Sequence, residues 1–346
     1  MNTIYIKMFL RLTFILITIL SFPVAALEIK VHKIPEKSEL RASAFNNGIA
    51  WVGGNNNTIY KSLNKGKSWV NVSLQEKQQY DIRDIEIINA QTAIAMAAGN
   101  GRKSALFITH DQGNNWQLLH TNPDEQGFYN SITFINKDIG YLMGDPIAHH
   151  FLIRKTADGG KTWFGIDLSH LPIKNQDEIA FAASGNTLIT TDLDSALFVT
   201  GGKQAFIYLK PSEQMTWTKQ ALPLHSKTPT SGAYSLSSNN KGDIFALGGD
   251  YKNRSGHYAN IVLLKKELAP QVVNIGGLVT AMQCHKALCI AVGKTNTYIS
   301  DDHGYHWSNL DMPNADGFYT ITEDNGTFIA AGSNGKIATF TGLESR

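Results

Sequence analysis

The sequence predicts an all-β fold, a seven-bladed β-propeller, and three observations support this prediction. One turn pattern, Ser/Thr-x-Asp/Asn-x-Gly-x-x-Trp, recurs along the chain, and short apolar segments precede and follow each copy. No segment after the first 26 residues has a convincing helical period. Short strands at even spacing, with turn residues between them, are typical of sheets repeated around an axis.

The turn pattern is that of an Asp box, and it occurs in four good copies. The copies are Ser62, Asn64, Gly66, Trp69; Thr109, Asp111, Gly113, Trp116; Thr156, Asp158, Gly160, Trp163; and Ser300, Asp302, Gly304, Trp307. A degraded copy ends at Trp217, so the tryptophans are separated by 47, 47, 54 and 90 residues. The last gap spans two periods, which predicts a blade without its box around residues 261–275.

Counting repeats gives seven units, which we expect to begin near Leu40, Arg83, Tyr129, Ile179, Tyr234, Leu278 and Phe318. The last unit lacks its final strand, and residues 27–34 could supply that strand and close the ring. Closure of this kind removes exposed sheet edges, which would otherwise invite aggregation. We therefore expect a single propeller domain at residues 27–346.

The boxes are interpreted as structural elements. The Asp or Asn side chain can accept hydrogen bonds from backbone N–H groups of the turn, and the glycine can adopt the positive φ that the turn requires. The tryptophan offers a large apolar surface that would fix the turn against its own blade. Because the same turn serves enzymes and binding proteins alike, it does not indicate catalysis.

Residues 1–26 are expected to be a secretory signal peptide. Lys7 and Arg11 precede an uncharged apolar run at residues 12–22, and small residues follow at 23–26. The run is shorter than the roughly 20 residues of a membrane span, although an uncleaved anchor is the alternative. Cleavage would leave an exported protein, periplasmic or secreted, without an integral membrane segment.

Charge and cysteine content restrict the partners and the chemistry. Loss of Lys7 and Arg11 takes the formal net charge from +2 to zero, which gives no support for nucleic acid as a partner. We expect the exported protein to be a monomer. Cys284 and Cys289 lie in a predicted hairpin, and an oxidising compartment favours a disulfide between them. Two buried thiols are the alternative.

Segments between the boxes resemble a known family. They are residues 40–42, 82–85, 128–131, 140–146, 181–185, 201–202 and 248–251, and in this order they are similar to exported bacterial propellers of the photosystem II stability and assembly factor family. Some of these propellers are labelled oxidoreductases or BNR-repeat glycosyl hydrolases. The resemblance implies a seven-bladed propeller that binds a protein client, such as a membrane-complex subunit, through an arginine-rich surface. This sequence lacks a dense basic face, so a photosystem client is not favoured.

A candidate recognition site is predicted at one mouth of the propeller. Arg41 and Arg83 occupy matching points of successive units, and the site would also include Asp84, Asp145, Asp250 and Tyr251. The alternative for each aspartate is a turn-capping role near a strand end. Arg83 and Asp84 could equally form an internal ion pair.

An enzymatic function is the alternative to a protein-binding scaffold. A sialidase needs three arginines, a tyrosine polarised by a glutamate, and an aspartic acid. Arg41, Arg83 and Arg254 could supply the arginines, but nothing in the sequence places them together, and the usual Arg-Ile-Pro motif is absent. A glycoside hydrolase with paired carboxylates could use Asp84, Asp145 and Asp250. No zinc-like ligand spacing and no nucleotide-binding loop is present, so no catalytic residue, metal or cofactor is assigned.

Overall fold

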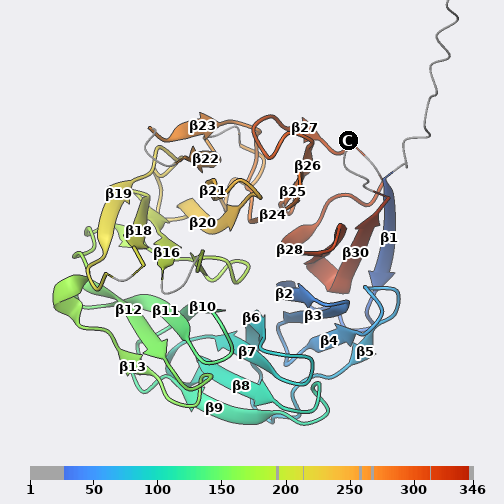
Figure 1. Cartoon of the computed structure of the whole chain (residues 1–346), viewed down its shortest axis with the longest axis horizontal. Helices are drawn as coiled ribbons and strands as arrows, with labels where there is room; N and C mark the ends of the chain where they lie inside the picture. Colours follow the sequence, from blue (N-terminus) through green and yellow to red (C-terminus); the bar gives the residue numbers. More distant parts are fainter. Residues whose placement is uncertain are drawn as a thin grey trace, which may run out of the picture.

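The structure is a computed structural model that describes residues 27–191, 195–212, 214–256, 259–265, 269–311 and 313–342. In these residues the strands form seven antiparallel blades arranged around a central axis (Figure 1). The first strand of each blade lies nearest the axis and contacts the first strand of the next blade, from β2 against β6 to β28 against β2. The predicted seven-bladed propeller is therefore confirmed.

The first three blades each contain four consecutive strands. Blade one contains β2 (Leu40–Asn46), β3 (Ile49–Gly54), β4 (Ile59–Ser62) and β5 (Val70–Asn71). Blade two contains β6 (Asp81–Ile87), β7 (Ala93–Ala98), β8 (Ala105–Thr109) and β9 (Gln117–Thr121), with the short helix η1 (Gly101–Lys103). Blade three contains β10 (Tyr129–Phe134), β11 (Gly140–Ile147), β12 (His150–Thr156) and β13 (Phe164–Gly165), followed by η2 (Leu168–His170).

The next three blades repeat this plan. Blade four contains β15 (Leu188–Ile189), β16 (Ala196–Val199), β18 (Phe206–Lys210) and β19 (Thr218–Ala221). Blade five contains β20 (Ser231–Ser238), β21 (Ile244–Asp250), β22 (Ile261–Leu264) and β23 (Gln271–Val273). Blade six contains β24 (Ala281–His285), β25 (Leu288–Val292), β26 (Thr297–Ser300) and β27 (Ser308–Asn309). The blade predicted around residues 261–275 is thus present as blade five.

The seventh blade joins the two ends of the described chain. It contains β28 (Phe318–Asp324), β29 (Thr327–Gly332), η3 (Ser333–Gly335) and β30 (Lys336–Thr341), and its outer strand is β1 (Glu28–Lys33). The strands β1 and β30 pair along six positions, from Glu28 opposite Thr341 to Lys33 opposite Lys336. Closure of the ring by the N-terminal strand is therefore confirmed. The predicted signal peptide at residues 1–26 lies outside the described residues.

One predicted blade start was wrong. Blade four begins at Leu188 rather than at Ile179, whereas the other six blades begin within three residues of the predicted positions. The strand β14 (Glu178–Ile179) pairs instead with β17 (Gly201–Gly202), which joins the sheet of blade five where Gly201 lies opposite Gly232. The prediction failed because apolar residues 179–183 look like an inner strand, although they serve a different purpose.

The four boxes share one hydrogen-bonded turn. The Ser or Thr hydroxyl donates to the Asp or Asn side chain at 2.8–2.9 Å and accepts from the glycine N–H at 2.7–2.9 Å. The same Asp or Asn side chain accepts a backbone N–H four residues later, at 2.9 Å in every copy. The glycines have φ between +78° and +86°, a range that residues with a Cβ rarely adopt.

The tryptophans contact their own blade and the preceding one. The Trp163 ring lies 6.0 Å from Phe134 of its own blade, and its Nε1 donates to Gly160 O of the same turn at 2.9 Å. The Trp116 ring of blade two lies 5.9 Å from Trp51 of blade one. The apolar cluster that contains Trp163 also includes strand residues of blade two. The expectation that a tryptophan fixes its turn against its own blade therefore holds for Trp163, and the contact with the neighbouring blade is an addition to it.

Two further features of the described residues bear on the sequence predictions. Cys284 lies directly opposite Cys289 in the β24–β25 hairpin, and the two form a disulfide, which confirms the predicted bridge. Among the described residues, no helix has the length and apolar character that crossing a bilayer requires.

Candidate functional site

A segment of blade four fills the centre of the ring. Residues 180–187, which we call the central plug, leave β14 and turn across the axis before β15 begins (Figure 1). The plug touches four other blades, because Ala182 O accepts from Arg83 Nη1 of blade two and Gly185 O accepts from Ser131 Oγ of blade three. On the other side, Ser184 Oγ donates to Thr280 O beside blade six at 2.7 Å, and Thr187 Oγ1 bonds Tyr234 O of blade five at 3.0 Å.

The plug separates two pockets at opposite ends of the central channel. Plug residues 181–183 line one pocket, and Asn186 lines the other. Residues near the start of the inner strands, such as Arg41 and Arg83, line the first pocket. Residues further along the same strands, such as Ser43 and Glu86, line the second. Each mouth therefore opens into a pocket whose floor is the plug, and not into a tunnel through the ring.

The first pocket, which we call the arginine pocket, is basic and aromatic. It has a volume of about 280 Å³, and the charged and tyrosine side chains that line it are Arg41, Arg83, Arg254, Lys294, Tyr234, Tyr251 and Tyr319. Two acids lie beside it, since Asp81 pairs with Arg83 at 2.6 Å and Glu39 bonds Tyr319. With four cationic side chains against two acids, the pocket is suited to an anionic ligand.

Arg41 and Arg83 are held in fixed positions. The Arg41 guanidinium lies over the Tyr319 ring, 4.2 Å from its centroid. Burial lowers the pKa of Arg41, and the nearby charge of Arg83 lowers it further. Arg83 pairs with Asp81 and not with Asp84, so the predicted alternative of an Arg83–Asp84 ion pair does not form. Two guanidinium groups that repel each other across a pocket favour an anion between them.

The tyrosines give the arginine pocket an aromatic wall. Phe181 of the plug stacks on Tyr234 with the ring centroids 4.2 Å apart and the planes 3° from parallel. Tyr251 meets the edge of Phe181 at 6.2 Å and keeps 41% of its surface exposed. An exposed tyrosine beside cationic groups can contact both the apolar and the polar parts of a partner.

Tyr319 and Glu39 form a close pair at the edge of this pocket. The Tyr319 hydroxyl donates to Glu39 Oε2 at 2.5 Å. Burial opposes ionisation of Glu39, but the hydrogen bonds from Tyr319 and from the Asn334 backbone outweigh it, so the pKa of Glu39 is lowered. Arg254, Arg41 and Arg83 line the same pocket, a convergence that the sequence could not establish.

The second pocket, which we call the carboxylate pocket, contains Asp84 and Glu86. It has a volume of about 270 Å³ and a mainly polar lining. Asp84 accepts from Ile132 N at 2.8 Å and from Ser131 Oγ at 3.1 Å. Burial raises the pKa of Asp84 to about 8, although these hydrogen bonds oppose the rise. Burial also raises the pKa of Glu86, and the Asp84 charge adds to that effect.

Asp145 and Asp250 line neither central pocket. Asp145 accepts from Asn130 Nδ2 at 2.8 Å, and burial raises its pKa. Asp250 accepts from the hydroxyls of Thr228 and Thr230 at 2.9 and 2.7 Å and from a backbone N–H of the next turn. Of the six residues predicted at one mouth, the structure thus brings together Arg41, Arg83 and Tyr251 and places the three aspartates elsewhere.

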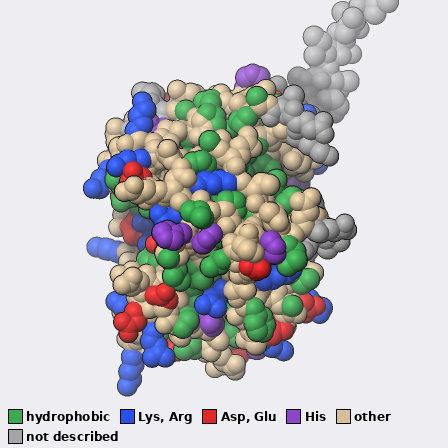
Figure 2. All heavy atoms as spheres, turned by 90° about the vertical axis from the view of Figure 1, so that its left-hand side faces the viewer, with side chains coloured by type: hydrophobic (Ala, Val, Ile, Leu, Met, Phe, Trp, Pro, Cys, Tyr) green, Lys and Arg blue, Asp and Glu red, His purple; other side chains and the backbone are tan. Residues whose placement is uncertain are grey.

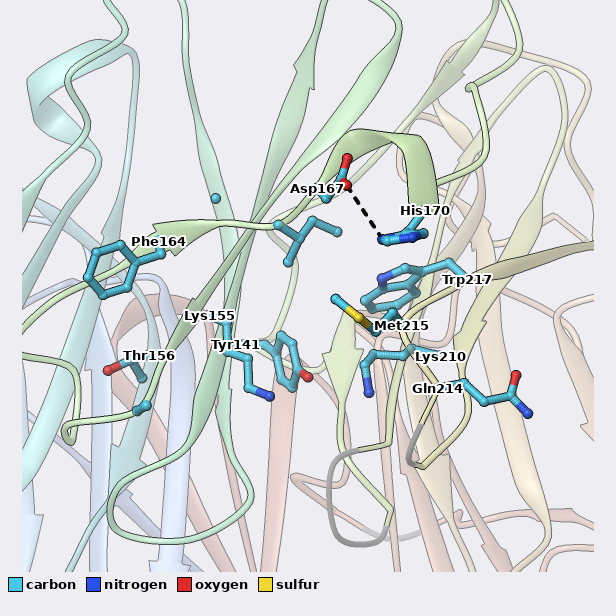
Figure 3. A pocket seen from close by; sticks show the side chains of 13 residues that line it. Tyr141, Lys155, Thr156, Phe164, Asp167, His170, Lys210, Gln214, Met215 and Trp217 are labelled. Carbon is cyan, nitrogen blue, oxygen red and sulfur yellow. Dashed lines mark ion pairs between the residues drawn. The ribbon is translucent and has the colours of Figure 1, made fainter.

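A third pocket, which the sequence did not predict, lies at the rim between blades three and four. It has a volume of about 420 Å³, and Tyr141, Phe164, Met215 and Trp217 line it together with lysines of β12 and β18 (Figure 3). On this face of the molecule apolar side chains lie among lysines and histidines (Figure 2). Phe164 and Met215 are 68% and 69% exposed. The sequence did not indicate this pocket because its lining residues come from two blades and are far apart along the chain.

The described residues contain no group of three or more His, Cys, Asp or Glu side chains that could hold a metal ion. Charged and aromatic side chains line the arginine pocket, and mainly polar groups line the carboxylate pocket.

Comparisons with known proteins agree on the fold. No family model matches the chain, and no curated protein matches it. Among solved structures, YCF48 bound to a D1 peptide is similar with a TM-score of 0.66 and 14% identity, over 90% of this chain and 96% of YCF48. YCF48 from Cyanidioschyzon merolae gives 0.65 and 15%, over 91% and 99%. The family resemblance seen in the sequence is thus accompanied by a match in fold to YCF48, a photosystem II assembly factor, over about nine-tenths of this chain.

Enzymes share the same architecture. Virginiamycin B lyase from Staphylococcus aureus matches with a TM-score of 0.65 and 10% identity, over 91% of this chain and 99% of the lyase. A GH74 xyloglucanase from Xanthomonas campestris matches with 0.57 and 13%, over 90% of this chain and 53% of the enzyme. At these identities the similarity establishes the propeller fold, and function must be argued from the site.

Proposed function

We propose that this protein is an exported propeller that binds a protein partner through the arginine pocket and acts as a non-catalytic assembly scaffold. The observation that carries the proposal is the joint placement of Arg41, Arg83 and Arg254 with the exposed Tyr251 in one pocket. Arginine and tyrosine are the residues that most often dominate binding energy at protein interfaces. YCF48, which has the same fold, was solved with a D1 peptide bound to it, so one propeller of this shape does bind a peptide.

The chemistry of the pocket indicates the part of the partner that it recognises. Its excess of cationic groups favours an acidic side chain or a chain-terminal carboxylate, and its aromatic wall favours an apolar neighbour of that group. Because the plug closes the channel, the partner would insert a single group and could not thread through the ring. Contacts of this kind suit a scaffold that holds one element of a larger complex.

The first experiment is cross-linking of the tagged protein in its native cells, followed by mass spectrometry. We expect a reproducible protein partner whose capture falls at least tenfold in the double variant Arg41→Glu, Arg83→Glu, since both guanidinium groups become repulsive. Arg102→Glu is the matched control, because Arg102 is exposed on η1 and does not line the pocket. Capture that is equal in the double variant and the control would contradict the proposed surface.

A folding defect must be separated from lost binding, since Arg83 also bonds the plug. Tyr251→Ala serves this purpose, because Tyr251 is 41% exposed and its removal should leave the melting temperature within a degree or so. Weakened capture with unchanged melting would support direct contact. Unchanged capture by Tyr251→Ala together with unchanged capture by the arginine variant would refute the proposal.

A sialidase-like glycoside hydrolase is the second candidate, and one observation favours it. Three arginines share the pocket with Tyr319, whose hydroxyl bonds a glutamate, so most of the required set is present. Against it, Tyr319 is only 4% exposed and Arg41 covers its ring. Turnover of a fluorogenic sialoside that Tyr319→Phe abolishes would establish this candidate. Absence of turnover, with partner capture intact in Tyr319→Phe, would exclude it in favour of the scaffold.

Paired carboxylates could support other glycosidase chemistry, but the structure changes the residues concerned. Asp84 has Glu86 as its neighbour in the carboxylate pocket, not Asp145 or Asp250. A carboxylic acid with a pKa near 8 could act as a general acid at neutral pH. A panel of neutral glycosides tests this directly: hydrolysis lost in both Asp84→Asn and Glu86→Gln would support it.

A further inference from the structure

Three polar side chains lie close together between blades two and three, and each has one buried atom without a hydrogen-bond partner among the described protein atoms. These atoms are His120 Nε2, Tyr129 Oη and Arg154 Nε. We call these residues the donor cluster. Buried polar groups are almost always satisfied, so three unsatisfied groups in one place require an explanation.

The strands bring these residues together from separate parts of the sequence. His120 on β9 lies opposite Leu106, and Arg154 on β12 lies opposite Leu142. Leu106, Leu142 and Tyr129 belong to one apolar cluster between the two blades. The His120 and Tyr129 rings are 9° from parallel with centroids 6.2 Å apart. The cluster therefore occupies the outer part of this interface.

Ser104 fixes the start of β10, because the Tyr129 N–H donates to Ser104 Oγ at 2.8 Å. Tyr129 is 0% exposed, so its hydroxyl is shielded from bulk water. Burial of a polar group without a partner costs roughly 1–3 kcal/mol in protein mutational data, which makes an unsatisfied arrangement of three groups unfavourable.

The electrostatics of the cluster are those of an anion site. Burial lowers the pKa of His120, and the Arg154 charge lowers it further. Burial raises the pKa of Tyr129 to about 12, with Arg154 opposing the rise, so the hydroxyl keeps its proton at neutral pH. All three groups can donate a hydrogen bond, given the appropriate histidine tautomer. No described carboxylate forms an ion pair with Arg154, so its charge has no counter-ion there.

We propose that the donor cluster binds a small oxyanion of the phosphate or sulfate class. A tetrahedral oxyanion presents several acceptor oxygens to converging donors, and a guanidinium supplies a charge-assisted hydrogen bond. The site is distinct from the arginine pocket, because none of its residues lines that pocket. A bound anion would link β9 of blade two to β12 of blade three and stabilise the ring at this interface.

The test is thermal unfolding of the purified protein in a buffer free of oxyanions, with sodium phosphate or sodium sulfate added at constant ionic strength. We expect a saturable rise in melting temperature that reaches about 5 °C at 100 times the Kd. Arg154→Gln and Tyr129→Phe should each reduce the rise by at least half. Arg83→Gln, which alters the arginine pocket, should leave it unchanged.

Three results would overturn the proposal. One is a rise no larger than that given by sodium chloride at the same ionic strength, and another is an equal rise in Arg154→Gln and the unaltered protein. The third is a crystal structure grown in phosphate with only water bridging the three donors. Should Arg154→Gln fail to fold, the milder Tyr129→Phe removes one hydroxyl and keeps the ring, so the comparison remains decisive.

Discussion

Trp163 joins blades two and three, and its replacement by alanine should weaken the ring at that interface. Only 7% of its surface is exposed, and its ring meets Phe134 edge-on with the centroids 6.0 Å apart. Its Nε1 donates to Gly160 O at 2.9 Å, so the same side chain also holds the turn. A Cβ at Gly160 would lie 3.0 Å from Ile94 of blade two, which shows how closely the turn approaches the neighbouring blade.

The expected loss follows from the area that the tryptophan covers. A buried aromatic side chain of this size removes about 150–250 Å² from water, which at about 25 cal/mol per Å² corresponds to about 4–6 kcal/mol. Measured Trp→Ala changes in cores fall at about 3–5 kcal/mol, because the surroundings partly collapse into the cavity. We therefore expect Trp163→Ala to lower the free energy of unfolding by about 4 kcal/mol.

The assay is equilibrium urea unfolding followed by far-ultraviolet circular dichroism, with the m-value compared between variants. Phe164→Ala is the matched control, because Phe164 is the next residue along the chain and is 68% exposed. We expect that control to change the free energy of unfolding by less than about 0.5 kcal/mol. The reasoning would be refuted if Trp163→Ala and Phe164→Ala unfolded within about 1 kcal/mol of each other at equal m-value.

Three further changes test other parts of the structure. Glu178 is fully buried and pairs with Lys219 at 2.7 Å. Glu178→Gln leaves the charge of Lys219 without its carboxylate, so we expect the free energy of unfolding in urea to fall by about 3 kcal/mol. A fall of less than about 1 kcal/mol would show that the pair is dispensable. The pKa of Asp84 is about 8 in the folded protein, against 3.8 ordinarily, so the folded state holds a proton that the unfolded chain releases. Stability should therefore fall as pH rises from about 4 to about 8, at up to about 1.4 kcal/mol per pH unit, and Asp84→Asn should flatten this dependence in urea midpoints at pH 5 and 8. An unchanged slope in that variant would contradict the assignment. The disulfide closes a short loop, so replacing both Cys284 and Cys289 by alanine should cost no more than about 2 kcal/mol in thermal unfolding, and a failure to fold would contradict the chain-entropy argument.

The sequence by itself determined the repeat and its closure. Each box is a local turn in which a hydroxyl, an Asp or Asn and a glycine lie within a few residues, so the pattern can be recognised without knowledge of distant contacts. The spacing of Trp69, Trp116 and Trp163 follows from the length of one blade. The missing strand of the last unit pointed to the N-terminal segment, and the disulfide followed from a two-strand hairpin.

Only the tertiary structure decided what lies at the centre of the ring. Residues 180–187 have the apolar character of an inner strand, and they become a plug because their partners, such as Arg83 and Thr280, lie about 100 residues away in the chain. The same long-range placement brings Arg254 to Arg41 and Arg83, separates Asp84 from Asp250, and adds strand residues of blade two to the surroundings of Trp163. Local patterns specify each blade, because its hydrogen bonds join strands that follow one another. Contacts between blades depend on how seven sheets close around one axis, and no single segment contains that information.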